Sequence, residues 1–254
     1  MASEYPEHFV HRLEILWGRG FMSPGGASEV REIFKGLDVA GKRVLDIGCG
    51  IGGPGLVIAG ELGAGSVTAV DVDAELLGRA AANAEEAGLK IDFRLIAPGP
   101  LPFADGSFDI VFSKEAFLHV KDKLALFVEI RRVLKPGGVL AASDWLAGEN
   151  REASPEWAAY QRLASYSIIP ATARECALML EEAGFIHVST RDRNAWYAKL
   201  AGEHLAQIEG PLKAELIAAS SPEIYADWAN MRRAQTAAVQ AGAMRPTHLR
   251  GVKP

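Results

Sequence analysis

The sequence has little cysteine, no long apolar run and no excess of positive charge, and each shortage excludes a class of protein. Cys49 and Cys176 are the only cysteines among 254 residues, too few for a disulfide framework. No apolar run is long enough to span a membrane, and the N-terminus lacks the basic region and apolar core of a signal peptide. The formal net charge of −5 gives no field that attracts nucleic acid. We therefore expect a cytoplasmic protein with reduced cysteines and with neither a nucleic-acid nor a membrane partner.

The sequence also shows no cluster of His, Cys, Asp and Glu at metal-ligand spacing, so we expect no metal site. What it does have is a composition ordinary for a globular α/β protein, with 49% hydrophobic and 23% charged residues. Strand and helix patterns alternate, which indicates a doubly wound parallel sheet. The expected strands cover 43–48, 67–70, 91–96, 108–113, 139–143, 185–189 and, with a weak pattern that we expect to be antiparallel, 246–252. The expected helices cover 27–37, 56–62, 74–87, 124–134, 156–166, 171–183, 199–219 and 224–241.

The chain is organised around Val44–Gly55, which reads VLDIGCGIGGPG. A buried strand runs there into a glycine-rich turn, and glycines allow positive φ angles and close approach of a ligand to the backbone. Gly48, Gly50 and Gly53 also match the G-x-G-x-x-G pattern of dinucleotide dehydrogenases, which is weakly specific by itself. Asp46 at the end of the strand would repel a pyrophosphate but suits the cationic methionine end of S-adenosylmethionine. The simpler alternative is a solvated acid at a strand end.

A second acid, Asp71, ends the next expected strand about twenty residues after the glycine loop. A carboxylate at that place can accept both hydroxyls of a ribose. Alternatively, Asp71 caps the next helix, but Asp73 is better placed to do so, with Gly88 as the C-terminal stop. We therefore expect Asp71 to bind a nucleoside and Asp73 to cap the helix.

Four segments, taken in order, carry a resemblance to a known family. They read VLDIGCGIGG, AVDVD, LPFADGSFDIVFS and LKPGG and lie between residues 40 and 145. This set resembles the class I S-adenosylmethionine-dependent methyltransferases, and dehydrogenases do not combine its members. The resemblance implies a Rossmann-like α/β sheet of seven strands in the order 3-2-1-4-5-7-6 with the seventh antiparallel. It also implies S-adenosyl-L-methionine as the cofactor and S-adenosyl-L-homocysteine as its product.

A narrower resemblance covers nearly the whole chain. The segments EYPEHF near the start, SKEAFLHV over 113–120, ASDW over 142–145 and EWAAYQRLASY over 156–166 are similar to phosphoethanolamine N-methyltransferases. This resemblance implies that Tyr5 and His119 form a catalytic pair and that Glu115 faces the substrate amine. Together with the glycine loop, it gives a set of expected cofactor contacts that comprises Tyr5, Met22, Ser23, Asp46, Gly48, Gly50, Gly53, Asp71, Val72, Ala97, Pro98, Lys114 and His119.

Two loops have particular parts in that set. Met22-Ser23 matches the segment that closes over the cofactor in the similar enzymes. Ala97-Pro98 stands where many relatives have an aspartate that accepts from the adenine amino group. We therefore expect backbone groups, apolar contacts or water to hold the adenine here.

The sequence departs from the similar enzymes where they bind the phosphate of their substrate. Their clamp uses tyrosines, an arginine and a lysine. Here Tyr160 and Tyr166 remain, Trp145 replaces one tyrosine, Ala164 replaces the arginine and Thr236 replaces the lysine. The three aromatic residues suit cation–π contact with a methylated ammonium group, or they pack the insertion onto the sheet. We expect a substrate whose anionic group is smaller or less charged than a phosphate.

Methyl transfer to an amine makes one demand beyond alignment and the exclusion of water. The amine is mostly protonated at neutral pH and must be delivered as the free base. A histidine can accept such a proton, so we expect His119 to be the base and Tyr5 to hydrogen-bond to it and latch the N-terminal cover. On the residues alone, a single histidine after a strand is more often structural. Glu115 either attracts an ammonium group or pairs with Lys114 or Arg131.

We expect a single domain over residues 1–254, in which 1–27 form the N-terminal cover and 40–145 the cofactor-binding core. Residues 146–170 are expected to form a helical insertion before the sixth strand that caps the substrate, and 171–254 the remaining strands and helices. The sequence thus predicts an N-methyltransferase acting on a small-molecule amine, as a monomer or homodimer. An O- or C-methyltransferase acting on an aromatic or lipid-like molecule, and a non-catalytic S-adenosylmethionine-binding protein, stay open as alternatives.

Overall fold

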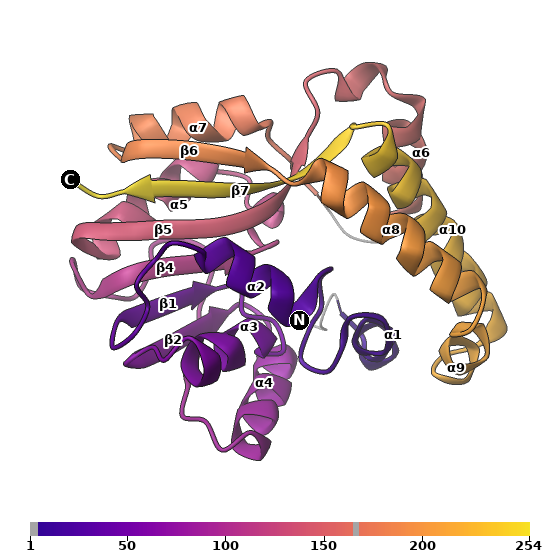
Figure 1. Cartoon of the computed structure of the whole chain (residues 1–254), viewed down its shortest axis with the longest axis horizontal. Coiled ribbons are helices and arrows are strands. Elements are labelled where there is room, and N and C mark those ends of the chain that lie inside the picture. The colour runs from indigo at the N-terminus through magenta and orange to yellow at the C-terminus, as the bar shows by residue number, and fades with distance from the viewer. Residues whose placement is uncertain (1–4, 165–167) are drawn as a thin grey trace.

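The computed structural model describes residues 5–164 and 168–254. Its centre is a seven-stranded sheet with the strand order β3-β2-β1-β4-β5-β7-β6 (Figure 1). The strands are β1 (Arg43–Ile47), β2 (Ser66–Asp71), β3 (Asp92–Leu95), β4 (Phe108–Lys114), β5 (Leu134–Ala147), β6 (Ile186–Asp192) and β7 (Met244–Val252). The pairs from β3 to β5 are parallel, and β7 runs antiparallel to both β5 and β6. The predicted Rossmann-like fold with an antiparallel last strand is therefore confirmed.

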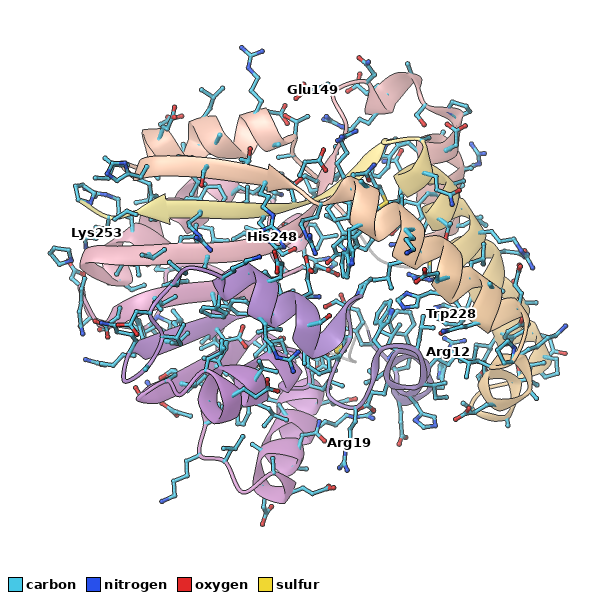
Figure 2. All side chains as sticks on the ribbon, viewed as in Figure 1. Arg12, Arg19, Glu149, Trp228, His248 and Lys253 are labelled. Carbon is cyan, nitrogen blue, oxygen red and sulfur yellow. The ribbon has the colours of Figure 1, made fainter. Side chains whose placement is uncertain are left out.

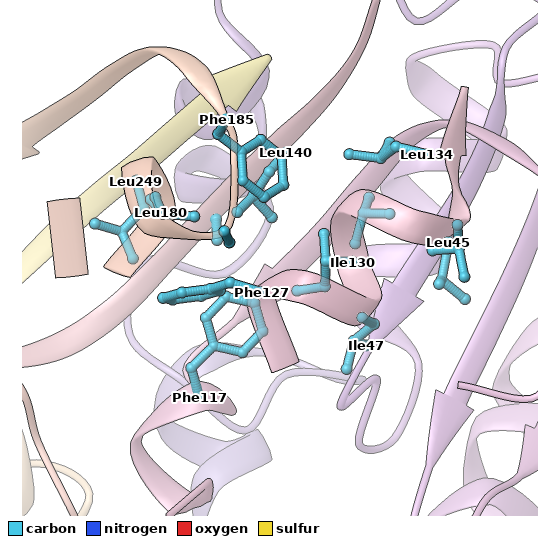
Figure 3. Close-up of a cluster of buried hydrophobic side chains, with 14 of the residues drawn as sticks. Leu45, Ile47, Phe117, Phe127, Ile130, Leu134, Leu140, Leu180, Phe185 and Leu249 are labelled. Carbon is cyan, nitrogen blue, oxygen red and sulfur yellow. The ribbon is translucent and has the colours of Figure 1, made fainter. Parts of the chain in front are cut away.

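Helices cover both faces of the sheet, because successive residues of a strand point to opposite sides. In β1, Val44 belongs to the apolar cluster of α2 (Gly26–Phe34), and Leu45 to the cluster of α5 (Lys123–Val133). Figure 3 shows the cluster of α5, with Phe127 and Ile130 beside side chains of the strands. The other helices are α1 (Glu7–Trp17), α3 (Gly53–Leu56), α4 (Ala74–Glu86), α6 (Pro155–Leu163), α7 (Ala173–Glu182), α8 (Asn194–Glu209), α9 (Lys213–Ala218) and α10 (Pro222–Gln240), with the short turns η1 (Val57–Glu61), η2 (Phe117–His119) and η3 (Arg151–Ala153).

The start of α4 follows the sequence prediction. The carboxylate of Asp73 accepts hydrogen bonds from the backbone N–H groups of Glu75 and Leu76, as an N-cap does. Gly88 follows the helix with a positive φ of 67°, which glycine adopts without strain. The prediction that Asp73 caps this helix is confirmed.

Two predicted helices differ from the structure. The prediction of one helix over 199–219 is wrong. The helix α8 begins earlier, at Asn194, and Gly210 and Pro211 interrupt the helical structure between α8 and α9. Proline lacks the N–H that a helix interior requires, so the break has a local cause. The helix predicted over 56–62 starts earlier, at Gly53, and continues as the π-type turn η1.

Beyond the end of β5, the helices α6, α8 and α10 form a further apolar cluster, which is rich in aromatic side chains and separate from the two clusters on the sheet (Figure 1). The cover helix α1 packs on it. The indole N–H of Trp17 donates to Nδ1 of His204 at 3.3 Å, and the Arg12 guanidinium lies 5.3 Å from the Trp228 ring centroid (Figure 2). The buried aromatic members of this cluster are Trp145, Trp157, Tyr160, Tyr197, Tyr225 and Trp228. None of the helices in the described part of the chain combines the length and apolar character needed to cross a bilayer.

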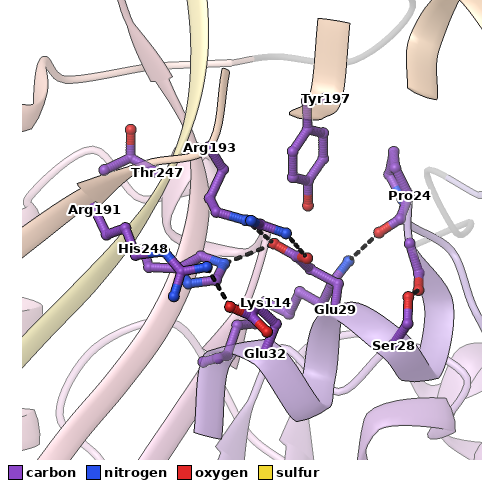
Figure 4. A network of polar contacts seen from close by, with 12 residues as sticks. Pro24, Ser28, Glu29, Glu32, Lys114, Arg191, Arg193, Tyr197, Thr247 and His248 are labelled. Atoms are coloured by element: carbon purple, nitrogen blue, oxygen red, sulfur yellow. Dashed lines mark hydrogen bonds and ion pairs between the residues drawn. The ribbon is translucent and has the colours of Figure 1, made fainter. Parts of the chain in front are cut away.

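A buried group of charges ties α2 to the last strands. Glu29 is 1% exposed, and Arg193 donates to its two carboxylate oxygens at 3.1 and 2.7 Å. Nε2 of His248, on β7, lies 2.6 Å from Oε1 of the same carboxylate (Figure 4). These contacts thus join α2 to Arg193 and His248, which lie far from it in the sequence.

Candidate active site

The glycine loop between β1 and α3 is packed so closely that side chains would not fit. A Cβ at Gly48, where φ is 73°, would lie 2.3 Å from Cβ of Ala116. A Cβ at Gly53 would lie 2.2 Å from the carbonyl oxygen of Gly20, which accepts a hydrogen bond from the Gly53 N–H at 2.9 Å. The loop therefore presents bare backbone, and the N-terminal segment lies directly on it.

Asp71 connects this loop to the end of β2. Its carboxylate accepts from the backbone N–H of Gly50 at 2.8 Å and from that of Asp73 at 3.0 Å. The side chain is 9% exposed, and burial raises the pKa of the carboxyl. The next residue, Val72, is 60% exposed, and Ala97 and Pro98 are exposed as well. An acid and an apolar surface thus lie beside the glycine loop, where the sequence predicted a nucleoside.

Asp46 lies below the loop. It is 1% exposed, and neither of its carboxyl oxygens has a hydrogen-bond partner among the described residues. Burial raises the pKa of this carboxyl to about 8, with a further contribution from the charge of Asp71. Because such an orphaned buried group is unfavourable by itself, it fits a site that a ligand or ordered water completes. Contact with a cofactor stays a prediction.

The segment around Met22 lies against the glycine loop. A Cβ at Gly50 would lie 3.1 Å from the sulfur of Met22, so this side chain lies on the glycine loop. The ammonium of Lys114, at the end of β4, donates to the carbonyl of Pro24 at 3.0 Å and contacts the hydroxyl of Ser23. Lys114 therefore fastens the N-terminal loop to the sheet, and its predicted contact with a cofactor stays a prediction.

The structure brings together the two residues of the predicted catalytic pair. The hydroxyl of Tyr5 lies 3.2 Å from Nε2 of His119, although 114 positions separate them in the sequence. His119 is the last residue of η2, just after β4, and it is exposed. Tyr5 packs with Met22 and Ile51, which places it beside the glycine loop. Their catalytic role stays a prediction.

Glu115 follows Lys114 with a φ of 59°, an uncommon angle for a residue other than glycine. Its side chain is 8% exposed. The indole N–H of Trp145 donates to its carboxylate at 2.6 Å, the hydroxyl of Tyr197 at 3.2 Å and the ammonium of Lys114 at 3.3 Å. The predicted pairing with Lys114 is thus present, whereas Arg131 donates to a main-chain carbonyl elsewhere.

The aromatic residues of the predicted substrate site lie in different surroundings. Trp145 is 6% exposed and touches Glu115, whereas Tyr160 is fully buried and lies against Trp157, with ring centroids 6.0 Å apart. The environment of Tyr160 is that of a core residue. Tyr166 lies outside the described residues.

Sequence reasoning missed Tyr197, which holds Glu115 from α8. Because the helix was expected to begin at residue 199, this tyrosine fell outside it. The sequence signal that could have identified Tyr197 is its place in the first turn of the helix that follows β6. Within the described ranges, no group of three or more His, Cys, Asp or Glu side chains is placed to hold a metal ion.

The chain is similar in sequence to known methyltransferases. A family model described as a methyltransferase domain matches residues 45–142. Phosphoethanolamine N-methyltransferase 3 of Arabidopsis thaliana is 31% identical over 225 residues, which are 88% of this chain and 45% of the plant protein. The chain thus spans about half the length of the curated relatives it matches.

Two solved structures share the fold over nearly the whole chain. Phosphoethanolamine N-methyltransferase 2 of Haemonchus contortus, in complex with phosphomonomethylethanolamine and S-adenosylhomocysteine, has a TM-score of 0.88 at 24% identity, covering 100% of this chain and 61% of that one. A putative sarcosine dimethylglycine methyltransferase of Galdieria sulphuraria has a TM-score of 0.81 at 20% identity, covering 97% of each chain. The sheet order and the domain match show that the chain has the fold of the class I S-adenosylmethionine-dependent methyltransferases, and phosphoethanolamine N-methyltransferases are similar proteins.

Proposed function

We propose that this protein transfers a methyl group from S-adenosyl-L-methionine to the nitrogen of a small-molecule amine. The observation that carries the proposal is the hydrogen bond between Tyr5 and His119, which joins a proton acceptor to the N-terminal cover beside the glycine loop. The similarity to phosphoethanolamine N-methyltransferases supports an amine as the acceptor. Both fold neighbours also carry small amines in their descriptions. A cytoplasmic location and a monomeric or homodimeric state belong to the same proposal.

The residues present fit the cofactor. The glycine loop turns with positive φ at Gly48 and Gly50 beside Asp71, which would accept the ribose hydroxyls, and the exposed Val72 offers a surface for the adenine. When bound, S-adenosylmethionine supplies a methyl carbon on a positively charged sulfur, which a nucleophile displaces in line. The glycine loop and the N-terminal loop on it would fix that carbon and exclude water.

The Tyr5/His119 pair would remove the proton that blocks the amine. His119 would accept this proton, while the Tyr5 hydroxyl, 3.2 Å from its Nε2, would hold the imidazole in place and latch the N-terminal cover. A new nitrogen–carbon bond then forms as the carbon–sulfur bond breaks. Glu115 would hold the amine by its charge, in an orientation set by Trp145 and Tyr197.

Replacing Asp71 with alanine should weaken S-adenosylmethionine binding by roughly 1–3 kcal/mol, the range for lost hydrogen bonds to a charged group. Calorimetric titration of the cofactor measures this change. Asp73→Ala is the matched control, because Asp73 caps α4 and should alter thermal stability with little effect on affinity. An unchanged affinity in a folded Asp71→Ala variant would remove Asp71 from the cofactor site.

The proposal is tested by measuring S-adenosylhomocysteine release with a panel of acceptors. The panel holds phosphoethanolamine, 2-aminoethylphosphonate, ethanolamine, amino acids and aromatic amines, beside phenols and quinols. We expect turnover with amines only. Turnover confined to phenols or quinols would indicate an O- or C-methyltransferase, and cofactor binding without any product would indicate a non-catalytic protein.

A further inference from the structure

A small cavity lies between α8 and α10, next to the Glu115 site. Its walls include the side chains of Trp145 and Tyr197, the two residues that donate hydrogen bonds to Glu115. These two side chains therefore line the cavity and contact Glu115 at the same time. The lining residues are Pro24, Trp145, Tyr197, Ala201, His204, Arg232, Gln235, Thr236 and Val239.

The lining of this cavity carries positive charge. Arg232 is 5% exposed, contacts the amide oxygen of Gln235 and lies 5.2 Å from the Trp17 ring centroid. Burial, together with the charge of Arg232, lowers the pKa of His204 to about 4, so this histidine is neutral near pH 7. Among the described residues that line the cavity, Arg232 is then the one with a formal charge.

The size of that charge selects among possible anions. A phosphomonoester carries about −1.5 to −2 at neutral pH, whereas a carboxylate carries one negative charge and matches the planar fork of a guanidinium. Thr236 stands where the similar enzymes have a lysine, and it lies on the same cavity wall, one helical turn after Arg232. Ala164 adds no charge where those enzymes have an arginine.

We propose that Arg232 binds a carboxylate on the methyl acceptor, so that the substrate is an amine with a carboxylate in place of a phosphate. Its amine lies toward Glu115 and its carbon atoms lie against Trp145 and Tyr197. This inference rests on the proposed N-methyltransferase function. It assigns the anion site to a residue outside the clamp positions that sequence similarity indicates.

The first test compares acceptors of similar length on the wild-type protein. Glycine, β-alanine and 4-aminobutanoate carry a carboxylate, phosphoethanolamine and 2-aminoethylphosphonate carry a more highly charged anion, and ethanolamine carries none. We expect kcat/KM to be highest for one of the carboxylates. A preference for phosphoethanolamine, or equal rates with ethanolamine, would overturn the inference.

The second test uses Arg232→Gln on the same panel. We expect KM for the carboxylate amine to rise by about 10- to 100-fold, the equivalent of a lost charge-assisted hydrogen bond, with kcat/KM for ethanolamine little changed. Arg233→Gln is the matched control, because Arg233 is exposed and pairs with Glu209 outside the cavity. An unchanged KM in a folded Arg232→Gln variant would overturn the inference.

Two further measurements apply if Arg232→Gln does not fold or if no amine is methylated. If Arg232→Gln does not fold, Thr236→Lys adds a second cation to the wall and should shift preference from the carboxylate toward phosphoethanolamine; no shift counts against the inference. If no amine is methylated, the proposed function fails, and calorimetric titration of β-alanine into protein with S-adenosylhomocysteine decides the carboxylate site separately. Binding lost in Arg232→Gln supports that site, and no binding to wild type rejects it.

Discussion

Replacing His119 with alanine is expected to lower kcat for an amine substrate by roughly 10²- to 10⁴-fold at neutral pH, the usual contribution of a general base. The loss should shrink as the pH rises, because the free amine then accumulates without help from the protein. A pH–rate profile of the wild type and the variant measures both effects. A Tyr5→Phe variant should show a smaller loss of the same form, since the phenol holds the histidine in place and is not itself the base.

His11→Ala is the control for this series, because His11 is exposed on α1 and lies outside the proposed site. Calorimetric titration of S-adenosylhomocysteine into His119→Ala separates loss of the base from loss of a cofactor contact. A large loss of kcat that does not recover at alkaline pH would point to a hydroxyl acceptor. Undiminished activity at neutral pH would exclude His119 as the base.

Replacing Glu29 with alanine is expected to lower the free energy of unfolding by about 3–5 kcal/mol, the range for breaking a buried ion pair from one side. The substitution leaves Arg193 and His248 without the carboxylate that both contact. Urea unfolding monitored by tryptophan fluorescence measures the change. Glu32→Gln is the matched control, because Glu32 lies on the same helix as Glu29 but pairs at the surface with Arg191 of β6. This substitution should change stability by less than about 1 kcal/mol. Equal losses in the two variants would contradict the assignment.

The same carboxylate gives stability a defined pH dependence. Burial raises the pKa of Glu29, but hydrogen bonds from His248 and Arg193 outweigh it, so the pKa lies below its ordinary value of 4.5. The contribution of Glu29 is therefore full above that value and is lost as the pH falls through the lower pKa of the folded state. A Glu29→Gln variant should show a flatter decline of stability at acid pH. An identical decline in wild type and variant would show that other groups govern acid unfolding.

The sequence alone was enough to predict the sheet and the glycine loop, since both depend on short local patterns. β1 runs directly into glycines that the structure packs against Gly20 and Ala116, and the cap at Asp73 needs only the residues that follow it. The strand order came from a resemblance carried by four motifs, and the observed sheet has that order.

Residues whose place depends on distant packing could not be predicted. Glu29 is buried because its partners come from positions 164 and 219 residues away. Tyr197 and Arg232 lie on helices whose inward faces are set by how α8 and α10 pack beyond β5. Tyr160 was expected at the substrate, and its complete burial reflects packing against Trp157, which sequence spacing does not reveal.

The most direct test of the proposed function is the position of the transferred methyl group. S-adenosylmethionine with a deuterated methyl group is incubated with the wild-type protein and the best acceptor of the panel, and the product is analysed by mass spectrometry and NMR. We expect the deuterated methyl group on nitrogen, with one S-adenosylhomocysteine released for each methyl group transferred. Label on oxygen or carbon, with none on nitrogen, would contradict the proposed function.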